Sequence, residues 1–218
     1  MRLVARRALE VDLEARVVVA SDDARVLDAV APLGVEGVLT SPELGSGTER
    51  VAAVAALPQF AGSGIVLNVQ GDEPFFPLEA ALGAVERVRS GDPIGTAAAP
   101  LAQSDLMDPN RVKVVVDETG RALRFSRVLP ASGAWACQVE VLHHIGIYAY
   151  ERRALERWVK LRPDEQELSE GLEQLRPLAH DIPIGVARME VPAPRGVDTE
   201  EDLVLAERYA ETLSQRVG

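Results

Sequence analysis

The sequence is poor in several residue types, and each shortage excludes a class of protein. A single cysteine, Cys137, among 218 residues excludes an intrachain disulfide framework and any metal site built from several cysteines. No apolar run approaches the ~18 residues of a transmembrane helix. The first residues carry arginines but lack the apolar stretch of a signal peptide. We therefore expect a cytoplasmic protein that has no membrane partner.

Positive charge is scarce as well. Lysine occurs only at Lys113 and Lys160, and the formal net charge is −11. A protein that binds nucleic acid needs a basic face, so we expect no nucleic-acid partner. The composition is compatible with a small anionic substrate, because a few arginines that converge in one pocket reverse the local field.

Buried strands alternate with helices in the first half of the chain. Residues 16–20 and 64–69 are short apolar runs, typical of strands that are buried on both faces. Each run leads into polar residues and then a helix, and this rhythm predicts a mainly parallel sheet with helices on its faces. We expect a further strand at 35–39 and helices at 2–11, 24–33, 48–57 and 78–89.

The second half changes character, because strand-like segments follow one another with few helices between them. This order predicts an antiparallel extension of the sheet, with strands at 94–100, 111–116, 122–126 and 144–150. Helices are expected at 152–160 and 167–175, a last strand at 184–191, and a terminal helix that reaches residue 215. We find no linker and expect one domain, residues 1–218. The first strand and phosphate-binding loop that usually open a nucleotide-binding fold have no counterpart at the start of this sequence.

Two aspartates follow predicted strands directly. Asp72 lies in the turn Gln-Gly-Asp-Glu-Pro at 70–74, and Asp198 separates the last strand from the terminal helix. Ligands of such sheets bind outside the carboxyl ends of the strands, and Mg²⁺ usually takes only one or two carboxylates from the protein. Each aspartate also has a local structural explanation. Asp198 fits the position of a helix cap, and Asp72 fits that of a turn residue. The metal-site hypothesis requires that both face one crevice.

Other polar residues have a structural alternative. The segment Ser46-Gly-Thr-Glu-Arg50 opens a helix, and backbone amides at such a start favour anions or polar base edges, but it also reads as a capping box. Lys113, Arg127 and the pair His143-His144 lie on predicted strands, where solvent exposure is the default. Exposure is also the default for Glu173 and Gln174, which fall within a predicted helix.

Seven motifs occur together in the chain. In sequence order they are Ser46-Gly-Thr-Glu-Arg50, Gln70-Gly-Asp-Glu-Pro74, Lys113-Val-Val-Val-Asp117, Phe125-Ser-Arg127, His144-Ile-Gly-Ile-Tyr148, Leu172-Glu-Gln-Leu-Arg176 and Gly196-Val-Asp-Thr199. This order and wording resemble the CMP-KDO synthetases, the cytidylyltransferases that activate the sugar acid 3-deoxy-manno-octulosonate (KDO). The resemblance covers nearly all of residues 1–210 and implies a single-domain, Rossmann-like α/β nucleotidyltransferase fold.

The resemblance implies a reaction and a role for each motif. The anomeric hydroxyl of KDO attacks the α-phosphorus of CTP and releases pyrophosphate, a step of lipopolysaccharide biosynthesis that a homodimer carries out. Asp72 and Asp198 are the implied catalytic residues and hold Mg²⁺. The sugar pocket is implied to contain Gln70, Arg127, His144, Tyr148, Glu173 and Gln174, with Arg127 on the carboxylate. Nucleotide binding is implied for Ser21, Asp22, Ser46, Gly47, Thr48, Glu49 and Arg50.

The sequence departs from the family at two places. The family's Ile-Pro-Ala-Arg and Leu-Pro-Gly-Lys-Pro segments, which embrace the triphosphate, have no match here. The stretch between Arg127 and His144 lacks the family's Ile-Pro-Trp motif, and Trp135 is no obvious substitute. Two alternatives stay open: a cytidylyltransferase for another acid sugar, such as amino-KDO or sialic acid, and a non-catalytic protein that binds a nucleotide or sugar. The intact pair Asp72 and Asp198 favours an enzyme.

Overall fold

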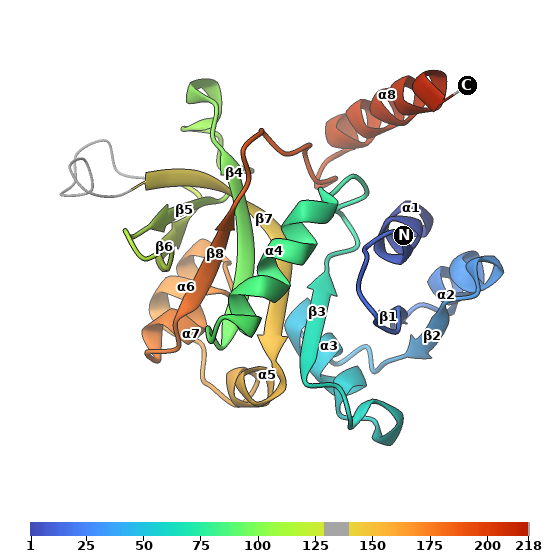
Figure 1. Cartoon of the computed structure of the whole chain (residues 1–218), viewed down its shortest axis with the longest axis horizontal. Helices are drawn as coiled ribbons and strands as arrows, with labels where there is room; N and C mark the ends of the chain where they lie inside the picture. Colours follow the sequence, from blue (N-terminus) through green and yellow to red (C-terminus); the bar gives the residue numbers. More distant parts are fainter. Residues whose placement is uncertain (129–139, 218) are drawn as a thin grey trace.

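A six-stranded sheet forms the centre of the protein (Figure 1). The computed structural model describes residues 1–128 and 140–217, so Trp135 and Cys137 lie outside the described residues. Along the sheet the strands follow the order β6-β5-β7-β4-β8, and β3 also pairs with β7. Their bounds are β3 (Ile65–Val69), β4 (Ile94–Pro100), β5 (Lys113–Val116), β6 (Ala122–Ser126), β7 (Glu140–Glu151) and β8 (Ile184–Arg188).

The long strand β7 organises this sheet. One edge of β7 pairs with β4 over nearly its whole length, while the other edge pairs with β5 near its start and with β3 near its end. These three pairings are antiparallel, and β8 pairs with β4 in parallel. Therefore β3, β4, β5 and β8 run in one direction, as a mainly parallel sheet predicts, although β7 makes most hydrogen-bonded pairs antiparallel. The α/β architecture predicted from the sequence, with an antiparallel extension of the sheet, is confirmed.

Helices cover both faces of the sheet. Helix α4 (Leu78–Arg89) lies on one face, where its alanines pack against β4 and β7 in a tight apolar layer. On the other face, Trp158 of α5 (Arg152–Trp158) packs edge-on against Tyr148 and Tyr150 of β7. A buried aromatic side chain of this size contributes about 2–3 kcal/mol by leaving water. The other helices are α1 (Arg2–Leu9), α2 (Ala24–Val30), α3 (Gly47–Ala55), α6 (Glu165–Glu170), α7 (Leu175–Ala179), α8 (Glu200–Val217) and the short η1 (Ala31–Leu33), η2 (Pro58–Phe60) and η3 (Gln103–Asp105).

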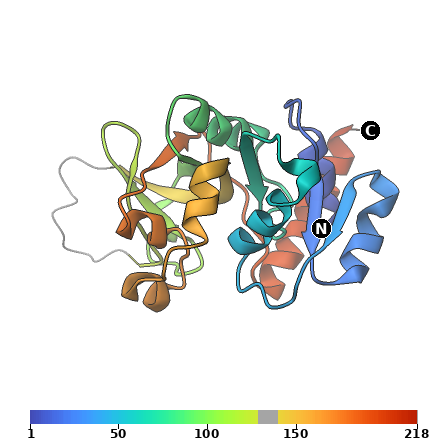
Figure 2. The ribbon, with the colours of Figure 1, turned by 90° about the horizontal axis from the view of Figure 1, so that it is seen from below.

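The N-terminal elements lie at one end of the molecule. Strands β1 (Val18–Ser21) and β2 (Glu36–Leu39) form a separate parallel pair beside α1 and α2. Figure 2 shows these elements opposite the end that holds β5 and β6. A cavity of about 1110 Å³ is lined by residues of α1, β1, α3 and β3. Within the described residues, none of the helices is both long and apolar enough to cross a membrane.

The structure corrects three expectations. The helix expected at 167–175 is two helices, α6 and α7, because Gly171 adopts a left-handed conformation with φ of 63° and ends α6. Glu173 and Gln174 therefore lie in the turn between them, and Gln174 is buried. The last strand ends at Arg188 and not at residue 191. Lys113, expected to be exposed, is fully buried. Its ammonium group donates to the backbone carbonyls of Asp108 and Arg127, which compensate for the loss of water.

Candidate active site

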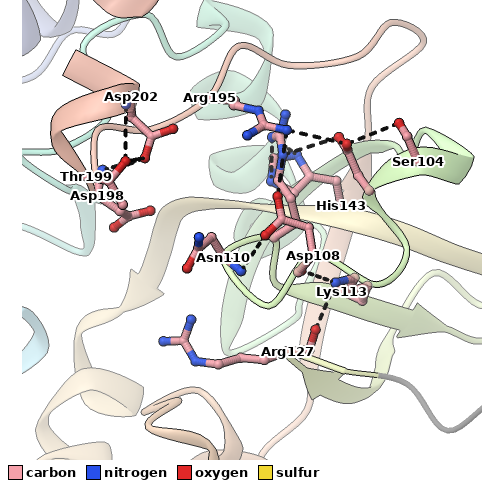
Figure 3. Close-up of polar contacts among 12 residues, drawn as sticks. Ser104, Asp108, Asn110, Lys113, Arg127, His143, Arg195, Asp198, Thr199 and Asp202 are labelled. Carbon is pink, nitrogen blue, oxygen red and sulfur yellow. Dashed lines mark hydrogen bonds and ion pairs between the residues drawn. The ribbon is translucent and has the colours of Figure 1, made fainter. Parts of the chain in front are cut away.

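A cavity of about 260 Å³ opens beside β7, between the turn after β3 and the segment that precedes α8. Its walls come from eight parts of the chain, several of them far apart in sequence. The structure brings together here all eight residues with an implied sugar or metal role, and Thr48 of the nucleotide group. They are Gln70, Asp72, Arg127, His144, Tyr148, Glu173, Gln174 and Asp198. Figure 3 shows Arg127 and Asp198 on opposite sides, with Asn110 between them.

Asp72 and Asp198 come close because the residue before Asp198 forms a backbone hydrogen bond with Asp72. The N–H of Val197 donates to the carbonyl oxygen of Asp72 at 2.7 Å. Burial raises the pKa of Asp72 above its ordinary value, and the neighbouring negative charge of Asp198 raises it further. Two carboxylates that repel each other in a partly buried site favour a bound cation.

The helix cap at α8 is Thr199, and so the capping alternative for Asp198 is wrong. The Thr199 hydroxyl accepts the N–H of Asp202 at 3.1 Å, and the Asp202 carboxylate accepts the N–H of Thr199 at 3.0 Å. Asp198 precedes this reciprocal cap, with its side chain at the cavity. Asp72 and Asp198 suit Mg²⁺, which takes one or two protein carboxylates and completes its shell with phosphates and water. Within the described residues, no group of three or more acidic, histidine or cysteine side chains is arranged to hold a metal ion.

Arg127 is fixed at the end of β6 by the turn after α6. Its Nε donates to the carbonyl of Glu170 at 2.9 Å, and its Nη1 donates to the carbonyl of Pro109 at 3.2 Å. The Glu170 carboxylate accepts the N–H of Arg127 and the hydroxyl of Ser126. The planar guanidinium is thus held in one orientation at the cavity wall, as recognition of a carboxylate requires.

His144 is neutral and its tautomer is determined by its partners. Thr96 gives its only hydroxyl proton to the carbonyl of Ile147 at 2.7 Å, so its oxygen accepts a hydrogen from Nε2 of His144 at 3.0 Å. Nδ1 is left as the acceptor of the ring. Burial lowers the pKa of His144 to about 3, with a smaller effect from His143. Burial also raises the pKa of Tyr148 well above its usual range, so its hydroxyl keeps its proton.

A buried ion pair between α6 and α7 stabilises the turn that carries Glu173 and Gln174. Arg176 donates from Nε to the carboxylate of Glu167 at 2.8 Å, and both side chains are about 90% buried. The pair joins α6 to α7 across the turn. The polar residues of the Leu172–Arg176 motif therefore have separate roles. Arg176 stabilises the turn, while Glu173 and Gln174 face the cavity.

The predicted nucleotide-binding residues lie at the start of α3 and the end of β1. Ser46 caps α3, since its hydroxyl accepts the N–H of Glu49 at 3.2 Å, and the Glu49 carboxylate accepts the N–H of Gly45. The capping alternative is therefore present. Arg50 donates to the carboxylate of Asp22 at 3.2 Å and so joins the two segments. Gly47 and Arg50 line the larger cavity, whereas Ser21, Asp22, Ser46 and Glu49 line neither cavity.

Sequence reasoning missed several residues of the smaller cavity. Arg111 contacts the ring of His143 at 3.1 Å, and Arg195 forms an ion pair with Asp105 at 3.4 Å (Figure 3). Burial, and next the charge of Arg111, lower the pKa of His143 to about 4. The one available signal was position, because the missed residues flank predicted ones in sequence. The missed lining residues include Glu73, Asn110, Arg111, His143, Arg195 and Asp202.

Glu73 is the most unusual of these residues. Burial raises its pKa to about 7, and the charges of Asp72 and Asp198 contribute further. Its carboxylate accepts the N–H of Gly146 on β7 at 3.3 Å. The carboxyl group of Glu73 is therefore close enough to Asp72 and Asp198 for their charges to act on it.

Comparisons with known proteins identify the family of the chain. The family model described as "Cytidylyltransferase" matches residues 1–184. A 3-deoxy-manno-octulosonate cytidylyltransferase of Gemmatimonas aurantiaca is 46% identical over 216 residues, which span 96% of this chain and 83% of the relative. The chain belongs to the 3-deoxy-manno-octulosonate cytidylyltransferase family. A member from Methylococcus capsulatus is 44% identical and covers 94% of this chain and 84% of its own length.

A solved structure from the same cytidylyltransferase family is similar in shape. A CMP:2-keto-3-deoxy-manno-octonic acid synthetase complexed with CTP superposes with a TM-score of 0.84 at 32% identity, covering 98% of this chain and 87% of the other. A 4-diphosphocytidyl-2C-methyl-D-erythritol synthase from Anaerococcus prevotii has a TM-score of 0.56 at 15% identity and shares the fold alone. The chain is therefore a nucleotidyltransferase, and a purely sugar-binding or nucleotide-binding role is not favoured.

Proposed function

We propose that this protein transfers CMP from CTP to the anomeric hydroxyl of KDO and releases pyrophosphate. The observation that carries the proposal is the cavity beside β7, which gathers residues of both aspartate loops and of the implied sugar pocket. The relatives that are named for this reaction support the choice of nucleotide and sugar acid.

The metal side of the reaction belongs to Asp72 and Asp198. Their carboxylates would hold Mg²⁺ together with oxygens of the nucleotide phosphates. When bound, Mg²⁺ would neutralise charge on the transferred phosphoryl group and on the leaving pyrophosphate. The Val197–Asp72 backbone hydrogen bond keeps the two carboxylates together before any ligand enters, so the site pays little reorganisation on binding.

The sugar side belongs to the residues of the implied sugar pocket, which line the same cavity. Arg127 would bind the carboxylate of KDO, since Glu170 and Pro109 already fix the plane of its guanidinium. His144 would accept a hydrogen bond from a sugar hydroxyl at Nδ1, and Tyr148 would donate one. Gln70, Glu173 and Gln174 would bind the remaining hydroxyls. This grip would orient the anomeric oxygen toward the α-phosphorus.

The bond changes follow from this orientation. The anomeric oxygen forms a new bond to the α-phosphorus, the bond between that phosphorus and the bridging oxygen to the β-phosphate breaks, and the hydroxyl proton is released. The cytosine is assigned to the start of α3, residues 46–50, with Ser21 and Asp22 beside the nucleoside. We place the enzyme in the cytoplasm as a homodimer that supplies CMP-KDO for lipopolysaccharide biosynthesis.

The test is release of pyrophosphate by the purified protein with Mg²⁺ and KDO. CTP, ATP, GTP and UTP are compared in parallel at one concentration, and amino-KDO and sialic acid replace KDO in further reactions. Turnover with CTP and KDO well above every other pair is expected. Equal turnover with ATP would contradict the choice of nucleotide, and faster turnover with sialic acid or amino-KDO would reassign the sugar acid.

A further inference from the structure

Glu73 fills a space that two glycines leave open. An ideal Cβ built on Gly146 would lie 3.2 Å from Oε1 of Glu73, and one on Gly196 would lie 3.5 Å from the same oxygen. The N–H of Gly146 also donates to this oxygen at 3.3 Å. The carboxyl group therefore lies between β7 and the segment before α8. A side chain at Gly146 would press on it, and one at Gly196 would come into van der Waals contact with it.

The three segments that meet at Glu73 carry the proposed active site. Asp72 is its neighbour in the turn after β3. Gly146 lies between His144 and Tyr148, which form the sugar wall, and Gly196 lies two residues before Asp198. From the turn of Asp72, the side chain of Glu73 accepts the N–H of Gly146 and lies beside Gly196.

We propose that Glu73 is a positioning residue, which sets the spacing of Asp72 and Asp198 relative to each other and to the β7 wall. This inference rests on the proposed function, because that spacing matters where a metal and a phosphate bind between the carboxylates. Its contribution comes from the shape of the group and its acceptor oxygen. A displacement of about 1 Å in a reacting pair is enough to cost on the order of 100-fold in rate.

The key experiment separates shape from charge. Glu73→Gln keeps the size of the side chain and an oxygen that accepts the N–H of Gly146, but removes the charge. Glu73→Ala removes the carboxyl group, and Gly146→Ala pushes against it without changing its chemistry. Glu79→Ala is the matched control, because Glu79 is exposed in the first turn of α4.

We expect Glu79→Ala to stay within about threefold of wild type in kcat, and Glu73→Gln to lose clearly less activity than Glu73→Ala. Glu73→Ala and Gly146→Ala should each lower kcat by roughly 10- to 100-fold and raise the Mg²⁺ concentration needed for half-maximal rate. In the Glu73→Ala background the added methyl at Gly146 should cost little more, since its target is gone. Melting curves show whether each variant is folded.

A second readout does not depend on turnover. Binding of CTP with Mg²⁺ raises the melting temperature of the wild type, and this rise should shrink in Glu73→Ala and Gly146→Ala but not in Glu73→Gln. If wild type shows the rise yet makes no CMP-KDO, the proposed function fails and the Glu73 inference is still decided by this measurement. The inference is overturned if Glu73→Gln is as impaired as Glu73→Ala, or if Glu73→Ala behaves as wild type in both readouts.

Discussion

Replacement of Arg127 by lysine is the most direct test of the sugar side of the cavity. The guanidinium of Arg127 uses Nε and Nη1 to reach the carbonyls of Glu170 and Pro109 at 2.9 and 3.2 Å. A lysine has a single nitrogen, which cannot satisfy these carbonyls and also present two parallel donors to a carboxylate. We therefore expect Arg127→Lys to lose one charged hydrogen bond to KDO.

The size of the effect follows from that loss. One hydrogen bond to a charged group is worth about 1.5–3 kcal/mol, so kcat/KM for KDO should fall by roughly 10- to 160-fold. The KM for CTP should change less than threefold, because the start of α3 comes from another part of the chain. The assay is a pair of steady-state titrations, one varying KDO at saturating CTP and one the reverse.

Stability must be separated from binding in this experiment. The two carbonyl hydrogen bonds lost in Arg127→Lys cost about 1–2 kcal/mol together, which lowers the melting temperature by roughly 2–4 °C per kcal/mol in a chain of this size. Arg153→Lys on the exposed side of α5 is the matched control. An unchanged KDO titration would refute a role of Arg127 in the sugar site, and a defect confined to CTP would move Arg127 to the nucleotide side.

Three further predictions concern the metal, the fold and the pH dependence. Asp72→Asn and Asp198→Asn should each reduce turnover at least 100-fold while melting stays near wild type; near-normal rates in Asp198→Asn would leave no metal role for it. Glu167→Ala leaves Arg176 buried without its partner and should cost about 3–5 kcal/mol in urea unfolding, and a loss below 1 kcal/mol would contradict a buried pair. The pKa of His144 falls from an ordinary value near 6.5 to about 3 on folding, so the unfolded state binds more protons between these values and stability falls as pH drops through that window. His144→Gln should flatten this fall between pH 6.5 and 4 in urea titrations, and an unchanged slope would contradict the low pKa.

Much of the fold could be predicted from short-range patterns. The apolar runs at β3, β4 and β5 and the caps of α2 and α3 are local signals, and they marked these elements to within a few residues. Strand β7 was expected to begin at residue 144 but begins at Glu140. Its pairing on both edges was not predictable, because partner residues 24 to 86 positions away in sequence decide which strands it joins.

The residues of the candidate site were predicted from sequence motifs that resemble a known family. The residues that hold them in place were not predicted. A pair such as Asp72 and Asp198 can be proposed from positions after strands, but the Val197–Asp72 hydrogen bond that joins them is a tertiary contact. Burial of Lys113 was also missed, since the carbonyls that compensate its charge belong to the loop before β5 and the turn after β6, 5 and 14 residues away. The break at Gly171 was the exception, because a glycine ahead of Leu172 is a local signal that could have ended α6.

The placement of β7 at the centre of the sheet also determines when the protein can fold during synthesis. Strands β3 and β4 leave the ribosome well before their common partner, and β4 must wait longer still for β8, whose residues 184–188 lie about 90 positions downstream. Until β7 has emerged, the exposed edges of these apolar strands have no native partner. A chain with such distant pairings folds slowly and is open to aggregation while it waits. The nascent protein is therefore expected to depend on chaperone protection over the interval between residue 100 and the end of β7.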